Sequence, residues 1–306
     1  MTVSSSPQIS SSICAVCHDR KVKHAFVATD RNRLVDRRVF EILRCPKCGL
    51  GYTIPGLPVE KLQAYYPDHY YNLDENVLME ASKASKLFRQ DRIDLIKRYV
   101  SSGALIDIGS GTGMFLKSAR ENGFEVEGLE ISRDAAAFGN RTWGLNIKQG
   151  NLHDSVFPPD RYDVVTLWHV FEHLHEPLVA VKQLYDLTKP GGLLVIAVPN
   201  FASVQARLFR SRWFHLDVPR HLFHYTPESL KMIVEAVGFK TLEINFFSRE
   251  HNWAGILGSI MRLNPINESF VHKATRKLIG VPVIRCVALL EAFAKRGGTF
   301  ELLARK

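Results

Sequence analysis

The pattern of apolar and polar positions predicts a repeating architecture from residue 101 onward. Short apolar runs there alternate with longer stretches that suit helices. The runs predict strands near 104–108, 125–129, 145–149, 162–168 and 192–198, with a helix between each pair, and two later strands at 238–246 and 299–304. Strands that alternate with helices favour a parallel sheet with helices on both faces. The predicted fold class is therefore α/β.

The first of these strands contains Asp107 and turns into a segment with three alternate glycines, Gly109-Ser110-Gly111-Thr112-Gly113. Glycines allow positive φ and a close approach of a ligand, and the free N–H groups of the following helix then face that ligand. Glu130 ends the second strand, where a carboxylate can accept both hydroxyls of a ribose. The pattern predicts binding of a nucleotide-type ligand; the alternative is a glycine turn without a ligand.

The glycine spacing indicates which nucleotide is bound. The third glycine comes two positions earlier than in the dinucleotide fingerprint, and no Lys-Ser/Thr follows to hold a triphosphate. Asp-x-Gly-x-Gly-x-Gly resembles motif I of class I S-adenosylmethionine (SAM)-dependent methyltransferases. The resemblance implies SAM as cofactor and a Rossmann-like seven-stranded sheet of order 3-2-1-4-5-7-6, with the seventh strand antiparallel. It also implies that Asp107 and the glycine turn hold the amino-acid end of SAM and that Glu130 holds its ribose.

The resemblance implies further SAM contacts at the ends of the third and fourth strands. Asn151 and Leu152 follow the third strand, where the family commonly has an acid for the adenine amine. The side-chain carbonyl of Asn151 can accept that hydrogen bond. Trp168 ends the fourth strand, which faces the transferring methyl.

Three polar residues come directly after Trp168: His169, Glu172 and His173. A helical turn would bring them to one face. Some quinone-pathway O-methyltransferases have a Glu-x-x-Glu-His segment here that can bind a divalent metal, but this chain has His in place of the first Glu. We expect His169 to lie near the substrate; a catalytic metal and a purely structural capping role stay open.

A second cluster of titratable residues, between 213 and 225, follows the fifth strand. It resembles the His-x-Asp-x-Pro-Arg-His segment of a bacterial methyltransferase subgroup, which implies a wall of the acceptor pocket. Methyl transfer mainly requires a positioned nucleophile, and a hydroxyl acceptor also needs a base. We predict His221 as this base, oriented by Asp217, with His169 as its rival. Arg220 would hold an anionic substrate group bidentately; a structural salt bridge with Asp217 is the alternative.

The N-terminal part carries two cysteine pairs, Cys14-x-x-Cys17 and Cys45-x-x-Cys48, separated by a polar span that suits a β-hairpin. This spacing predicts a structural zinc site with all four positions filled; disulfides or ordinary thiols are the alternatives. Together with a tyrosine-rich link and motif I, it resembles a bacterial subgroup often associated with surface-polysaccharide and other small-molecule pathways. The predicted organisation is a disordered lead (1–12), a zinc ribbon (13–60), a helical linker (61–100) and a methyltransferase domain (101–306) with insertions near 200–225 and 249–298.

Composition adds two expectations. The net charge is +9, and residues 201–306 hold sixteen Lys and Arg against eight Asp and Glu, which suggests an anionic neighbour or a solvated basic surface. Neither a signal peptide nor a membrane span is expected, so we predict a cytoplasmic protein, or a peripheral one at the inner membrane face. The basic and apolar stretch 249–298 suits a substrate lid, a homodimer interface or an interfacial membrane helix. Cys286 within it is expected to be a buried packing thiol.

The sequence thus predicts a SAM-dependent methyltransferase that acts on a small-molecule acceptor, at a hydroxyl of a sugar or related metabolite. One alternative is an RNA methyltransferase whose zinc ribbon and basic C-terminal third hold phosphates. Another is a non-catalytic zinc-ribbon protein that senses SAM.

Overall fold

The polypeptide folds into two units, each assembled from distant parts of the sequence. The computed structural model describes residues 13–58, 65, 86–155, 157–248, 251–260 and 281–306. The first unit takes its residues from Met1–Tyr65, Val198–Met232 and Asn245–Phe300, and the second unit from Tyr66–Ala197, Ile233–Ile244 and Glu301–Lys306. This division differs from the predicted one, because the two predicted insertions group with the cysteine-bearing segment. The predicted lead and most of the predicted linker lie outside the described residues.

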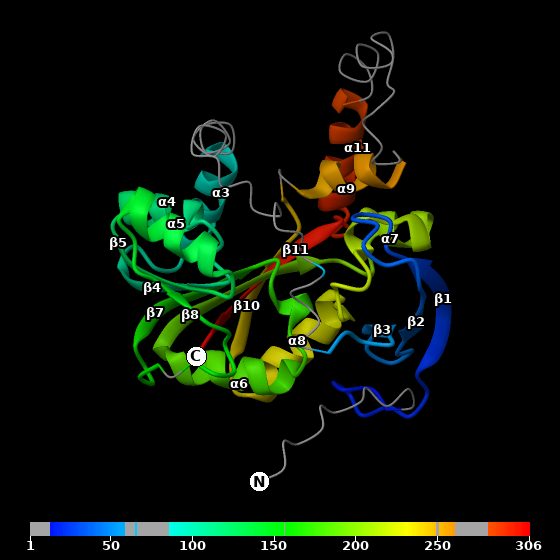
Figure 1. Cartoon of the computed structure of the whole chain (residues 1–306), viewed down its shortest axis with the longest axis horizontal. Coiled ribbons are helices and arrows are strands. Elements are labelled where there is room, and N and C mark those ends of the chain that lie inside the picture. Colours follow the sequence, from blue (N-terminus) through cyan, green and yellow to red (C-terminus); the bar gives the residue numbers. More distant parts are fainter. Residues whose placement is uncertain (1–12, 59–64, 66–85, 156, 249–250, 261–280) are drawn as a thin grey trace. The chain divides into compact units, whose positions relative to one another are not determined.

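The second unit is built on a seven-stranded sheet of order β10-β11-β8-β7-β4-β5-β6 (Figure 1). Its strands are, in chain order, β4 (Gly103–Ile108), β5 (Phe124–Glu130), β6 (Ile147–Gln149), β7 (Tyr162–Trp168), β8 (Thr188–Pro199), β10 (Lys240–Asn245) and β11 (Thr299–Arg305). Numbered along the chain, they lie in the order 3-2-1-4-5-7-6. The pairs β4–β5, β4–β7, β5–β6 and β7–β8 are parallel. The carboxyl ends of these strands therefore share one edge of the sheet.

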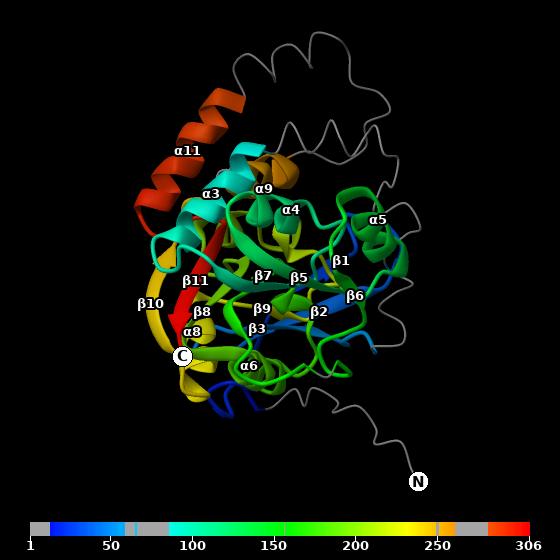
Figure 2. The ribbon, with the colours of Figure 1, turned by 90° about the vertical axis from the view of Figure 1, so that its left-hand side faces the viewer.

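Helices cover both faces of this sheet, as the alternation of strands and helices predicts. α3 (Lys86–Lys97), α4 (Met114–Glu121) and α5 (Arg133–Trp143) lie against one face, and α6 (Pro177–Leu187) lies against the other (Figures 1 and 2). The expected helix between the third and fourth strands is wrong: the described residues between β6 and β7 form turns. Pro158 and Pro159 lack the N–H that a helix needs, and Asn151 closes a local turn by accepting from the backbone N–H of Asp154.

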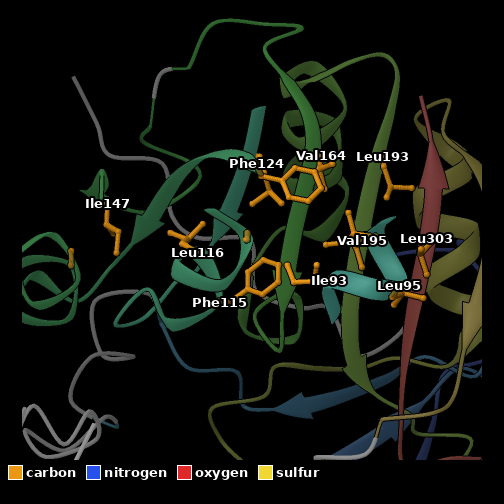
Figure 3. Close-up of a cluster of buried hydrophobic side chains, with 14 residues drawn as sticks. Ile93, Leu95, Phe115, Leu116, Phe124, Ile147, Val164, Leu193, Val195 and Leu303 are labelled. Atoms are coloured by element: carbon orange, nitrogen blue, oxygen red, sulfur yellow. The ribbon is translucent and has the colours of Figure 1, made fainter. Parts of the chain in front are cut away.

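The core of the second unit lies between the sheet and the helices α3 and α4. Figure 3 shows Ile93 of α3 and Phe115 and Leu116 of α4 beside strand residues such as Val164 and Val195. All fourteen residues of this cluster are buried. The central strands are apolar on both faces because helices cover both. Each fully buried side chain of this size contributes roughly 1.5–3 kcal/mol, so this core fixes the strand ends that carry the polar residues described below.

The first unit contains a four-stranded sheet of order β1-β2-β3-β9. Its strands are β1 (Lys23–Thr29), β2 (Val39–Arg44), β3 (Gly51–Ile54) and β9 (Phe223–His224). β1 and β2 form the antiparallel hairpin that the span between the cysteine pairs predicts. β9 adds to β3 in antiparallel register, with Tyr52 opposite Phe223. A sheet edge of the N-terminal segment is thus completed by the segment that follows residue 200.

The other elements in the described part of the first unit are helices and 3₁₀ turns. They are α7 (Val204–Phe209), α9 (His251–Ile260) and α11 (Val281–Phe293), the 3₁₀ turns η3 (Arg210–Arg212) and η4 (Phe214–Leu216), and the start of α8 (Pro227–Ala236). Thr226 caps α8 by accepting from the N–H of Ser229 at 3.1 Å. Phe40 and Ile42 of β2 form one core with Phe201, Trp213 and their neighbours. No helix within the described residues has the length and apolar character needed to cross a bilayer.

Candidate functional site

The glycine turn, Gly109–Gly113, joins β4 to α4 in the conformation that the sequence predicts. The three glycines have φ of +73°, +56° and +79° in chain order. A Cβ on Gly109 would lie 2.4 Å from Val170 Cγ2, and one on Gly113 would lie 2.4 Å from Leu145 Cδ1. Both the left-handed backbone and the close neighbours therefore require glycine. Gly109 and Gly111 are partly exposed, and the turn lies at the carboxyl edge of the sheet.

Asp107 lies just before this turn and is almost fully buried. Its Oδ1 accepts a hydrogen bond of 2.7 Å from the hydroxyl of Thr166 on β7. Burial raises the pKa of Asp107 to about 7, although the Thr166 hydroxyl and the charge of Arg92 oppose the rise. A buried acid with such a pKa at a strand end is a typical functional-site residue.

Glu130 ends β5 beside the glycine turn, as predicted. Its carboxylate accepts hydrogen bonds from the backbone N–H of Gly111 at 2.7 Å and of Ser132 at 2.9 Å. A Cβ on Gly128, two residues earlier, would lie 2.7 Å from both Leu116 Cδ1 and Ser110 Oγ. The missing side chain of Gly128 leaves room for Ser110 and Leu116, so the glycine turn and Glu130 form one polar cluster.

Two buried polar atoms at the carboxyl edge of the sheet lack a hydrogen-bond partner among the described residues. They are Ser110 Oγ in the glycine turn and Trp168 Nε1 at the end of β7. Buried polar groups are normally satisfied, so these two atoms indicate a bound group that completes them. The Trp168 ring packs edge-on against Phe115, with centroids 5.3 Å apart, and the guanidinium of Arg92 lies 4.6 Å from its centroid. Arg92 comes from α3, and sequence reasoning missed it.

The residues after β6 take up a tight turn. Asn151 Oδ1 accepts from the N–H of Asp154 at 2.9 Å, and its Nδ2 donates to Asp154 Oδ2 at 2.5 Å. Leu152 is buried. A carbonyl oxygen has two lone pairs, so Asn151 retains one acceptor position. Sequence reasoning missed Asp154 as the partner that orients it.

His169 follows Trp168 with an unusual backbone. Its φ is +59°, in the left-handed region that a side chain with a Cβ rarely adopts. Its Nδ1 lies 3.5 Å from Oε1 of the buried Glu172 in η2 (Phe171–His173). His169, Glu172 and His173 do not form a set with all ligand atoms within 4.8 Å of one another, by a search of the described residues. The structure therefore brings His169 to Glu172 without assembling the three as a metal site.

In the first unit, the four predicted ligands form a cysteine cluster: Cys14, Cys17, Cys45 and Cys48. Their sulfur atoms all lie within 4.8 Å of one another, with Cys14 Sγ 3.5 Å from Cys48 Sγ and Cys17 Sγ 3.4 Å from Cys45 Sγ. All four are free thiols. Four sulfurs converging on one point fit a tetrahedral zinc ion. The hydroxyl of Tyr52 donates to Cys14 Sγ at 2.9 Å, which supports the cluster from β3.

Arg220 lies in the segment between 213 and 225, which we call the histidine loop, and it is completely buried. Its guanidinium donates to both oxygens of Asp217, at 2.7 and 2.9 Å, and to both oxygens of Asp30, at 2.7 and 3.2 Å. Burial raises the pKa of Asp217, but Arg220 and His221 outweigh that effect and hold it well below its usual range. The structure thus shows the salt-bridge alternative, extended by Asp30. Sequence reasoning missed Asp30 because it lies 190 positions away.

The ring of His221 lies within hydrogen-bond distance of a backbone carbonyl. Its Nδ1 lies 2.9 Å from the carbonyl oxygen of His215, whereas its Nε2 lies 3.9 Å from Asp217 Oδ2, too far for a hydrogen bond. His215 O is thus the nearer of the two groups to the ring, and the orienting role of Asp217 stays a prediction. In the neutral imidazole, Nδ1 is then the protonated atom and Nε2 carries the lone pair.

Hydrogen bonds that the sequence did not reveal connect the cysteine-bearing segment to the histidine loop and to Thr226, the residue that follows the loop. Thr53 Oγ1 on β3 donates to the carbonyl oxygen of His221 at 2.7 Å and lies 2.9 Å from His224 Nε2. Thr226 Oγ1 donates to the carbonyl oxygen of Cys48 at 2.9 Å. Asn32 Nδ2 donates to Asp217 Oδ1 at 2.7 Å. The cysteine-bearing segment therefore serves as the frame of the histidine loop.

Comparison with known sequences matches residues 81–244 to a family described as "Methyltransferase domain". A ubiquinone biosynthesis O-methyltransferase of Paraburkholderia phytofirmans is 25% identical over 159 residues, which cover 48% of this chain and 68% of that protein. A malonyl-[acyl-carrier protein] O-methyltransferase of Serratia marcescens is 25% identical over 201 residues, which cover 65% of this chain and 76% of that protein. Another ubiquinone-pathway relative, from Nitrosospira multiformis, is matched over only 43% of its length.

Solved structures share the fold. A SAM-dependent methyltransferase from Archaeoglobus fulgidus aligns with a TM-score of 0.51 and 24% identity, over 76% of this chain and all of that one. A methyltransferase of Haloferax volcanii, solved with its Trm112 activator, aligns with a TM-score of 0.53 and 14% identity, over 80% of this chain and 97% of that one.

Proposed function

The chain belongs to the methyltransferase domain family and is a SAM-dependent methyltransferase, and on that premise we propose that it methylates a hydroxyl of a small-molecule acceptor. The observation that carries the proposal is the joint position of Asp107, the glycine turn and Glu130 at one edge of the sheet. SAM supplies a methyl group on a positively charged sulfur, so the protein's task is to hold that group and position a nucleophile.

The proposed fit of SAM to the second unit rests on the polar groups at the glycine turn and at the end of β5. The backbone of the glycine turn and Ser110 Oγ are proposed to bind the amino-acid end, with Asp107 beneath them. Glu130 would exchange its bonds to Gly111 and Ser132 for the two ribose hydroxyls. Ser110 Oγ gains a partner in this arrangement, which explains why it is buried without one among the described residues.

The remaining cofactor contacts are proposed around the adenine and the sulfonium. The free lone pair of Asn151 Oδ1, with Leu152 beside it, would receive the adenine amine. Trp168 would line the path of the methyl, and Arg92, which lies over its ring, would face the carboxylate of SAM.

The acceptor atom is proposed to be oxygen because the relatives named above are O-methyltransferases. A sugar or related metabolite remains our proposed acceptor class. A hydroxyl must lose its proton during transfer, and such a base contributes roughly 10²–10⁴-fold in rate. His169 belongs to the same unit as the glycine turn and is the first candidate base. His221 is the second, with Nε2 as its basic atom.

The cysteine cluster is proposed to bind zinc in a structural role. Four thiols supply every ligand of a tetrahedral ion, which leaves no open position for chemistry. The hydrogen bonds of Thr53 and Thr226 would then connect the metal site to the histidine loop and hold that loop in place.

The test is incubation of the purified protein with methyl-labelled SAM and host extracts separated into small metabolites, glycans and RNA. We expect label in a small-metabolite or glycan fraction. Label in nuclease-sensitive RNA would contradict the acceptor class, and SAM binding without any labelled product would indicate a SAM sensor. With the acceptor known, His169→Ala and His221→Ala identify the base: the variant that loses 10²–10⁴-fold in kcat, with SAM affinity unchanged, lacks it.

A further inference from the structure

The helix α11 exposes large apolar side chains, which an ordinary surface helix would bury. Its large apolar side chains are exposed: Val283, Val287, Leu289, Leu290 and Phe293 retain between 43% and 73% of their accessible surface. A helix on a soluble protein normally turns such residues toward the core. Figure 2 shows the length of α11, at the red end of the colour scale. The exposed residues recur at spacings of three and four, so they form one apolar stripe along the helix.

The opposite, buried face of α11 carries small residues and an acidic one. Ala288, Glu291 and Ala292 are buried. The carboxylate of Glu291 accepts a hydrogen bond of 2.7 Å from Gln205 Nε2 on α7. This bond fixes the rotation of the helix about its axis, because turning the apolar stripe inward would pull Glu291 away from its donor. The exposure of the stripe is therefore built into the packing.

The exposed charged side chains of the described segment 281–298 are all positive. Arg285, Lys295 and Arg296 are exposed, whereas Glu291, the one acid in the described segment 281–298, is buried. Phe247, which is 43% exposed, extends the apolar surface by packing edge-on against Phe293, with ring centroids 4.9 Å apart. The surface thus combines large aliphatic and aromatic side chains with cations, and within the described segment 281–298 no carboxylate is exposed.

We propose that this face of α11 binds the surface of a bilayer containing anionic phospholipids. The apolar stripe would lie among the upper acyl chains while the three cations reach the headgroup phosphates. A second copy of this chain is the less favourable occupant, because it would bring two sets of cations together without acids to balance them. The helix lies on the bilayer and does not cross it, in agreement with its length. The proposal is independent of which acceptor is methylated.

The test is co-sedimentation of the full-length, zinc-loaded protein with vesicles of phosphatidylcholine, with and without phosphatidylglycerol. We expect binding to the anionic vesicles that weakens with added salt. The double variant Leu290→Gln/Phe293→Gln should bind at least tenfold more weakly, and each of Arg285→Ala, Lys295→Ala and Arg296→Ala should cost about fivefold. All of these side chains are exposed, so the fold should survive the changes.

The matched control is Leu208→Gln on α7, which removes a leucine of similar exposure (71%) from another helix of the same unit and should bind vesicles like the wild type. Absence of binding to either vesicle, or equal binding by the double variant, would overturn the proposal. A dimer that forms without vesicles and is lost in the double variant would also overturn the proposal, because that result would assign the face to a second copy.

Discussion

The glycine turn of the second unit and the histidine loop of the first unit carry the same kind of candidate residues but are held in place by different means. At the glycine turn, the local chain sets the positions of the polar side chains. Asp107 lies near the end of a buried strand, and Glu130 ends the parallel strand beside it. In the histidine loop, Asp217 and Arg220 are fixed by Asn32 and Asp30, which lie 185 and 190 positions earlier. A local pattern predicts how the first site is held, whereas only the tertiary fold reveals the partners that hold the second.

The contrast also concerns what the polar groups do. The second unit leaves Ser110 Oγ and Trp168 Nε1 without partners in the described part of the chain, as a binding surface does. The charges of the histidine loop are already matched within the unit, since Arg220 meets two carboxylates. Changes in the first unit should therefore act mainly on stability, and changes in the second unit mainly on ligand affinity.

The largest effect is expected from loss of the metal that we propose for the cysteine cluster. Cys48→Ser removes one of four ligands, and structural zinc in small domains contributes on the order of 10 kcal/mol to folding. We expect a loss of bound zinc and of the cooperative unfolding of the first unit, measured by metal analysis and thermal unfolding. Cys286→Ser is the control, because that thiol is exposed, contrary to the buried packing role expected for it. Retention of zinc and stability by Cys48→Ser would contradict the proposal.

A smaller effect is expected from breaking the buried ion pair of the histidine loop. Asp30→Ala removes one of the two carboxylates that contact the buried Arg220, and removal of one partner from a buried pair costs about 3–5 kcal/mol. Denaturant unfolding measures this loss. Asp186→Ala, which removes an exposed pair with Lys182, should cost less than about 1 kcal/mol. Equal costs for the two variants would show that the histidine loop is not held by this pair.

Asp107 should make stability depend on pH. Its pKa is raised from 3.8 to about 7 by burial, so in this window the folded protein holds a proton that the unfolded chain has released. The free energy of unfolding should therefore fall as pH rises from about 4 through 7, by on the order of 4 kcal/mol, and level off above about pH 8. Thermal unfolding across this range should show a flatter profile for Asp107→Asn. An unchanged slope in that variant would assign the effect to another group.

The smallest effect on stability, and the most specific one on binding, is expected at Glu130. Glu130→Ala removes the acceptor proposed for the ribose hydroxyls, and hydrogen bonds to a charged group are each worth about 1.5–3 kcal/mol. SAM affinity, measured by calorimetry, should fall at least tenfold, with a smaller loss for Glu130→Gln. Glu125→Ala, an exposed glutamate on the same strand, is the matched control and should bind SAM like the wild type. A loss of the same size in Glu125→Ala would mean that the strand, and not the carboxylate, is responsible.

The sequence allowed prediction of those features whose causes are local. Apolar runs placed the strands β4 to β8 to within a few residues, and the cysteine spacing anticipated the cluster of four sulfurs. It did not anticipate the turns between β6 and β7, where two prolines and the Asn151–Asp154 turn outweigh helical spacing. The exposure of Cys286 was missed because an apolar segment carries no signal of which face packs inward. Arg92, Asp30 and Thr53 act on residues far away in sequence, so no spacing marks them.

Hydrogen exchange of the protein with and without SAM tests the central claim, that SAM is held between the glycine turn and the end of β5. We predict that SAM slows exchange in peptides covering Asp107–Met114 and Glu130–Ser132, and that Glu130→Ala weakens this protection at equal SAM concentration. Unchanged exchange in both peptides at saturating SAM, or protection of equal strength in Glu130→Ala, would contradict the account.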